Sequence, residues 1–174
     1  ADKITDPYDK LKLYCDIATE LVSKNLNKSA RLFKDAIKFI AQIEDDYAKS
    51  QAYYDITTKL VKIHPDKAYN LVQELADKIT DPYDKLKLYC DIAAKLVKID
   101  PNKSARLFEE AIKFIAEIED DYAKSQAYGD IATKLVKIDP DKSARLFEDA
   151  IKFIAQIEDD YTKSQAYYDI TTKL

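Results

Sequence analysis

Residues 1–18 read ADKITDPYDKLKLYCDIA, and the same letters return without a change at residues 76–93. A second block, residues 28–60, returns as residues 142–174, with only Lys34 replaced by Glu148 and Ala48 by Thr162. Self-similarity at a fixed period of about 20 to 50 residues is the signature of a repeat array. The isoleucine before each acidic turn marks the start of a repeat, at Ile4, Ile43, Ile79, Ile118 and Ile157. We therefore predict a single array over residues 1–174, with repeats 4–42, 43–78, 79–117 and 118–156 and a half repeat 157–174.

Each repeat contains two amphipathic helical patterns. In the first repeat, apolar residues recur at steps of three and four from Tyr8 to Val22, and again from Ala30 to Ala41, which predicts helices rather than strands. Aspartate precedes proline at Asp6 and Asp81, a typical helix start, and paired aspartates stand there in the other repeats. Short turns between the helices favour antiparallel hairpins. We expect an all-α solenoid of about nine helices, in which each hairpin is covered by its neighbours.

The second repeat is shorter than the others near residues 75–78. Because the missing length is close to one helical turn, the apolar stripe can stay in phase. We expect a shorter second helix and a local irregularity there, without loss of the stack.

Composition excludes several classes of protein. The chain is 47% hydrophobic and 34% charged, with one glycine and a formal net charge of -4, which is typical of a folded domain and gives no electrostatic reason to expect nucleic acid or a membrane surface. No apolar run approaches the roughly 20 residues that cross a bilayer, and the first residues lack the apolar core of a secretion signal.

The turns of the array resemble those of tetratricopeptide repeats. The likeness rests on the segments Asp46-Tyr47-Ala48-Lys49, Asp121-Tyr122-Ala123-Lys124, Asp160-Tyr161-Thr162-Lys163, Ile99-Asp100-Pro101-Asn102 and Ile138-Asp139-Pro140-Asp141. The period is longer than the usual 34 residues of that family, and there is no tryptophan. The resemblance implies a right-handed superhelix whose concave side holds peptide segments of partner proteins.

By the same analogy, cations repeated on the second helices are candidates for binding an acidic or C-terminal peptide. These peptide-binding candidates are Arg31, Lys38, Arg106, Lys113, Arg145 and Lys152. Each arginine also precedes an acidic residue by four positions, so a solvated face of i,i+4 ion pairs is the simpler interpretation.

Aspartates repeated on the first helices, at Asp16, Asp55, Asp91, Asp130 and Asp169, could suggest metal or acid–base chemistry. All but Asp16 precede a lysine by four positions, which favours exposed i,i+4 pairs. Glu20 stands where that lysine is expected in the first repeat, and the pattern offers no functional reason for it. Hard cations need several oxygens from one small region, so we predict no metal site.

The remaining reactive side chains are sparse. Cys15 and Cys90 lie 75 residues apart in sequence number and should be free thiols, which is typical of a reducing compartment and predicts a cytoplasmic protein. The position of Cys15 is occupied elsewhere by tyrosine or by Gly129, which argues against a packed core site and favours a groove or inter-repeat position. The sole histidine, His64, precedes Pro65 and is expected to cap a helix. One histidine and two isolated cysteines do not supply the pair of nucleophile and general base that a catalytic site of this kind needs.

We therefore expect no enzyme and no cofactor, but a repeat scaffold that binds a protein or peptide segment or spaces other domains. An engineered or excised array without its own ligand is an alternative, favoured by the near-identical blocks. An RNA-binding helical repeat is disfavoured by the acidic balance. Uncapped apolar ends also predict end-to-end self-association.

Overall fold

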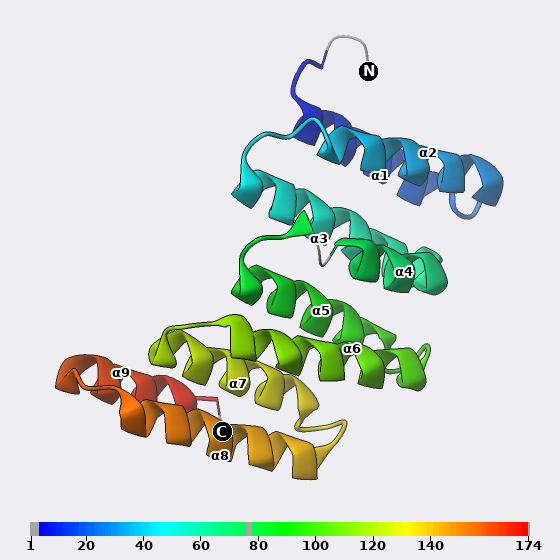
Figure 1. Cartoon of the computed structure of the whole chain (residues 1–174). Coiled ribbons are helices and arrows are strands. Elements are labelled where there is room, and N and C mark those ends of the chain that lie inside the picture. Colours follow the sequence, from blue (N-terminus) through cyan, green and yellow to red (C-terminus); the bar gives the residue numbers. More distant parts are fainter. Residues whose placement is uncertain (1–3, 76–77, 174) are drawn as a thin grey trace. The chain divides into compact units, whose positions relative to one another are not determined.

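The computed structural model describes residues 4–75 and 78–173, and within them the chain is all-helical, with no strand. The helices are α1 (Pro7–Leu21), α2 (Leu26–Ile40), α3 (Asp46–Ile63), α4 (Pro65–Leu75), α5 (Pro82–Leu96), α6 (Pro101–Phe114), α7 (Asp121–Leu135), α8 (Pro140–Gln156) and α9 (Asp160–Thr171), with a short 3-10 helix, η2 (Ile115–Glu117), after α6 (Figure 1). The predicted all-α helical-repeat fold is confirmed. The chain forms two compact units, Ala1–Thr80 and Asp81–Leu174, called here the N-unit and the C-unit.

Aspartate caps begin the first helix of every repeat. Asp6 precedes Pro7 in extended backbone, and its carboxylate accepts a hydrogen bond from the Asp9 amide at 2.8 Å. The same cap is made at 2.7 Å by Asp45, Asp81, Asp120 and Asp159. Such a cap satisfies an N–H group that has no partner inside the helix. The helix starts predicted from the aspartates are therefore confirmed.

In the hairpins α1–α2, α5–α6 and α7–α8 the two helices are joined by a buried serine, and in the α3–α4 hairpin Ala68 stands at that position. The Ser29 hydroxyl on α2 donates to the Ala18 carbonyl on α1 at 2.7 Å. Ser104 and Ser143 make the same bond at 2.8 Å, to the carbonyls of Ala93 and Ala132. Each hydroxyl is thus satisfied where the second helix meets the first, and the repeated bond sets the register of these hairpins.

In the N-unit, α1 packs on α2, and α3 packs on both of them and on α4. In the C-unit, the pairs α5–α6 and α7–α8 form hairpins, the first helices α5, α7 and α9 pack in sequence, and α8 also packs on α9. Fully buried side chains such as Leu11 and Ile56 in the N-unit and Phe108 and Ile131 in the C-unit lie between these layers. In both units, apolar faces are therefore covered by helices of the neighbouring repeat.

Helix α4 is the shortest second helix of the array. It has 11 residues, against 15 in α2, 14 in α6 and 17 in α8. The expected shortening is confirmed. The expected irregularity at residues 75–78 falls partly on residues 76 and 77, which lie outside the described residues.

Candidate functional site

The six predicted peptide-binding cations lie on exposed positions of three second helices. Arg31 and Lys38 are on α2, Arg106 and Lys113 on α6, and Arg145 and Lys152 on α8. The neighbouring carboxylates bind the lysines: the ammonium of Lys38 lies 2.6 Å from Asp35, and that of Lys152 lies 2.7 Å from Asp149. Exposed pairs of this kind contribute little to stability. Arg31 and Arg145 are therefore presented to solvent beside a lysine–aspartate pair, and Arg106 is exposed as well.

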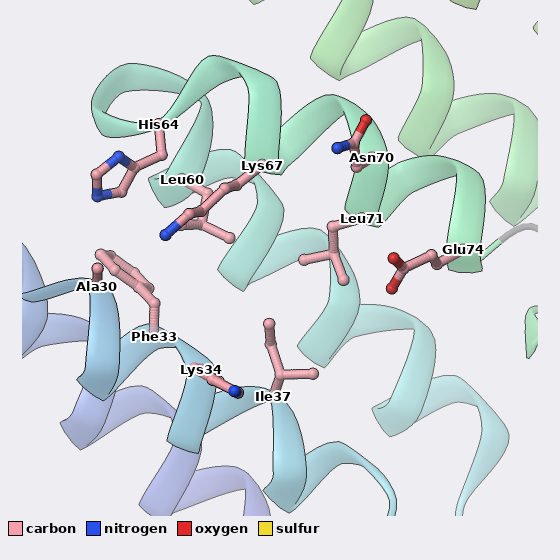
Figure 2. A pocket seen from close by; sticks show the side chains of 10 residues that line it. All are labelled: Ala30, Phe33, Lys34, Ile37, Leu60, His64, Lys67, Asn70, Leu71 and Glu74. Atoms are coloured by element: carbon pink, nitrogen blue, oxygen red, sulfur yellow. The ribbon is translucent and has the colours of Figure 1, made fainter.

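A groove lies between the second helices of the N-unit, with a volume of about 300 Å³. We call it the α2–α4 groove (Figure 2). Its floor is apolar and consists of Ala30, Phe33, Ile37, Leu60 and Leu71. Its rim is polar and consists of Lys34, His64, Lys67, Asn70 and Glu74. An apolar floor with a few polar groups around it is the usual composition of a binding pocket.

His64 stands at one end of this groove, between α3 and α4. Its backbone N–H donates to the Leu60 carbonyl at 2.7 Å and its carbonyl accepts from the Ala68 amide at 3.0 Å, so the backbone joins the two helices. Among the described residues, its buried Nε2 has no hydrogen-bond partner. Burial first, and then the Lys67 ammonium, lower the pKa of the imidazole below its usual value. The ring is therefore neutral at pH 7, with an unsatisfied nitrogen.

The C-unit contains the counterpart of this groove between α6 and α8, where a smaller pocket of about 210 Å³ is found. The repeats align residue for residue over this region, so Phe108 corresponds to Phe33 and Lys142 to Lys67. Glu109 occupies the position of Lys34, and its carboxylate lies 3.9 Å from the Lys142 ammonium. Asp139 occupies the position of His64 and caps α8. The rim of the α6–α8 groove is therefore internally paired.

The repeated aspartates of the first helices form a network between repeats, and the expected i,i+4 pairing with lysine is wrong. Lys134 of α7 reaches back to Asp91 of α5 at 2.6 Å, and Lys59 of α3 pairs likewise with Asp16 of α1. A long lysine side chain can span to an adjacent helix as easily as to the next turn of its own. The aspartates therefore connect successive first helices through ion pairs and do not form i,i+4 pairs along one exposed face.

Tyrosines of the preceding repeat complete this network. The hydroxyl of Tyr8 donates to Asp55 at 2.7 Å, that of Tyr83 to Asp130 at 2.5 Å, and that of Tyr122 to Asp169 at 2.8 Å. Burial and the accepting carboxylate raise the pKa of the first two phenols. Asp130 also accepts from Lys173, which follows the end of α9, at 2.7 Å. One carboxylate on α7 thus connects α5 to the segment that follows α9.

The position shared by Cys15, Cys90 and Gly129 is a packed one in these three repeats, contrary to the expectation from its variable size. The cysteines are 1% and 0% exposed, and both are free thiols, as predicted. A Cβ added to Gly129 would lie 2.5 Å from Cδ1 of Ile170, so α9 packs closely on α7 here. Burial raises the pKa of the Cys15 thiol to about 12 and also raises that of Cys90. Neither is suited to act as a nucleophile.

The described part of the chain contains neither a cluster of metal ligands nor a helix suited to a membrane. In residues 4–75 and 78–173, no group of three or more His, Cys, Asp or Glu side chains is placed to hold a metal ion. No described helix combines the length and the apolar character needed to cross a membrane.

Comparison with known proteins supports the fold class. No protein-family model matches the chain, and no curated protein sequence matches it. The structure is similar to the crystal structure of Ton1535 from Thermococcus onnurineus NA1, with a TM-score of 0.63 and 21% sequence identity over 92% of this chain. The match covers 46% of Ton1535, so the chain spans less than half of that protein. At this identity the likeness shows an all-α fold shared with Ton1535 and identifies no repeat family.

Proposed function

We propose that this chain is a non-enzymatic helical-repeat scaffold that binds an acidic peptide segment of a partner protein along its second helices. The observation that carries the proposal is the α2–α4 groove, whose apolar floor is partly formed by α2, the helix that also carries the exposed Arg31 and Lys38. A groove that combines apolar contact with nearby cations fits a peptide with apolar and acidic side chains.

The chemistry of the other side chains supports a binding role over catalysis. The two thiols are buried, with raised pKa values. Tyrosine hydroxyls of the first helices donate to aspartates of the next repeat, and at Asp130 the ammonium of Lys173 binds the same carboxylate. Groups engaged in this way hold repeats together, and they are not free to transfer protons to a substrate.

A random-peptide display library tests the proposal. The library is selected on the native chain, and the recovered peptides are then measured against the charge-reversal variant R31E/R106E/R145E. The matched control is K62E/K98E/K137E, which changes the net charge equally at exposed positions outside the second helices. Circular dichroism confirms that both variants remain helical.

We expect the selected peptides to be acidic, to bind the native chain and the control, and to bind the arginine variant at least fivefold more weakly. Recovery of no acidic peptide, or equal loss of binding in both variants, contradicts the proposal. Equal loss would indicate only a long-range effect of net charge.

A further inference from the structure

We infer that the α2–α4 groove is the specificity site of this scaffold, and that it binds a peptide segment in which a large apolar side chain is flanked by carboxylates. The inference rests on the proposed function and names the residues of the ligand. The apolar side chain lies on Phe33, Ile37 and Leu71, and a flanking carboxylate lies at the end of the groove where His64 and Lys67 stand, with Lys34 on the α2 side of the groove (Figure 2).

The floor defines the apolar part of the ligand. Phe33 is 2% exposed and Leu71 is 6% exposed, so both are held in the core of the N-unit and present a fixed surface. The volume of about 300 Å³ is at the lower end of the range of small-molecule pockets, about 300–1,000 Å³. A leucine or phenylalanine side chain fits such a space, and a whole folded domain does not.

The rim defines the charge of the ligand. Lys34 and Lys67 line the groove together, at the positions where Glu109 and Lys142 pair in the C-unit. The substitution of glutamate by lysine therefore replaces an internal ion pair with two cations on either side of an apolar floor. A carboxylate from a ligand restores the pairing that Glu109 supplies in the other groove.

Glu74 gives the groove a direction. Figure 2 shows His64 and Lys67 extending above Phe33, whereas Glu74 lies on the part of α4 farther from His64. A carboxylate is attracted to the first end and repelled from the second, because the acidic side chain of Glu74 carries the same charge as the ligand. The acidic flank of the peptide is therefore oriented toward His64.

His64 supplies an unsatisfied nitrogen at the cationic end. Its Nε2 is buried without a partner among the described residues, and an unpaired buried polar atom is costly. The charged groups lining the same groove are Lys34 of α2 and Lys67 and Glu74 of α4. In the free chain, burial and Lys67 lower the pKa of His64. A bound carboxylate favours the imidazolium, so it raises that pKa, and binding takes up a proton.

The experiment is an NMR titration of the full chain with a synthetic probe, acetyl-Glu-Glu-Leu-Phe-Glu-Glu-amide. Two matched peptides separate the contribution of the carboxylates to binding from that of the apolar side chains. One carries glutamine in place of glutamate, and the other carries serine in place of leucine and phenylalanine. Because the chain has one histidine, the imidazole signals report on His64 without assignment. The variant is K34E/E148K, which keeps the net charge constant, and the control is E148K alone.

We expect the probe to shift signals of α2 and α4, to raise the pKa of His64, and to bind more tightly at pH 6 than at pH 8. Tighter binding at pH 6 is expected because the bound imidazole takes up its proton more readily at lower pH, whereas exposed glutamates and lysines keep their charge over that range. Both matched peptides should bind at least fivefold more weakly. K34E/E148K should bind the probe about tenfold more weakly than E148K, a change of about 1.4 kcal/mol.

A probe that binds with no change in the His64 pKa, or with equal affinity to E148K and K34E/E148K, overturns the inference. In that case, the proposed function still holds if the library yields acidic peptides that bind R31E/R106E/R145E more weakly than the native chain. If neither the probe nor any library peptide binds, both the inference and the proposed function are contradicted.

Discussion

The α2–α4 groove and the α6–α8 groove share three floor positions, at which Ala105, Phe108 and Leu135 correspond to Ala30, Phe33 and Leu60, and they differ at the rim. Phe33 and Phe108 occupy equivalent positions and are 2% and 1% exposed. In the C-unit, Glu109 lies 3.9 Å from Lys142. In the N-unit, Lys34 replaces that glutamate, and His64 replaces Asp139.

The comparison distinguishes the residues that stabilise a repeat from the residues at the rim of its groove. Residues that face the neighbouring helix are kept in both grooves, because losing them costs core packing. The rim residues Lys34 and Glu109 are exposed, so this position can change charge at little cost to stability. One repeat can therefore change the charges at its rim while its copy keeps the ion pair between Glu109 and Lys142.

The largest expected effect tests whether the two floors are equivalent. Phe33→Ala and Phe108→Ala each remove a buried ring and leave a cavity, so each should lower the free energy of unfolding by about 3 to 5 kcal/mol. Urea denaturation followed by circular dichroism measures this. Ala105→Ser, at an exposed second-helix position, is the control. A loss below about 1 kcal/mol at either phenylalanine would show that the grooves do not share a packed floor.

The next effect tests the bridges between first helices. Asp130 accepts from Tyr83 and Lys173, whereas Asp55 accepts from Tyr8 and from Gln51 of its own helix. Asp130→Ala should lower the free energy of unfolding by about 1 to 2 kcal/mol, because a tyrosine hydroxyl and an ammonium both lose a partner.

Asp55→Ala, which leaves no ammonium without its partner, should cost less, about 1 kcal/mol. Equal losses in the two variants, measured by the same urea denaturation, would mean that the Lys173 contact contributes nothing to stability.

A smaller effect concerns the rim charges themselves. Lys34→Glu places a glutamate opposite Lys67, as in the C-unit, and should raise the free energy of unfolding by about 0.2 to 0.5 kcal/mol. Glu109→Lys should lower it by a similar amount. Both changes should disappear in 1 M salt, where charges are screened within about 3 Å. Thermal unfolding at low and high salt measures them, and an unchanged difference at high salt would exclude an electrostatic cause.

The smallest effect is a pH dependence confined to His64. Burial and Lys67 lower the folded-state pKa of His64 below the ordinary 6.5 of the unfolded chain. The unfolded state therefore binds more protons at acidic pH, and stability falls as pH decreases below about 6.5. Between pH 7.5 and 5.5, the melting temperature of the native chain should fall more than that of His64→Gln. Equal falls would show that His64 is not perturbed by folding.

The sequence was sufficient to predict the elements of the fold, because the signals are local. An aspartate in front of Pro7 or Pro82 satisfies amides within the next turn, and the cap geometry confirms it. The deletion near residues 75–78 shortens α4 as expected. The right-handed superhelix and end-to-end self-association remain predictions.

The pairing of charges was not predictable in the same way, because it depends on which helices lie side by side. Lys134 is four residues from Asp130 on its own helix, yet its ammonium lies 2.6 Å from Asp91. The unusual character of Lys34 was visible in the sequence as one of the few changes between residues 28–60 and 142–174. Its significance appears only when Lys67 and His64 are found in the same groove.

An exchange of the rim residues between the two grooves tests the central claim most directly. The variant K34E/E109K has the same net charge as the native chain and exchanges the two rim residues. In an NMR titration with acetyl-Glu-Glu-Leu-Phe-Glu-Glu-amide, we predict that shifts at α2 and α4 are lost and that shifts appear at α6 and α8. Binding that stays at α2 and α4 in this variant would contradict the account.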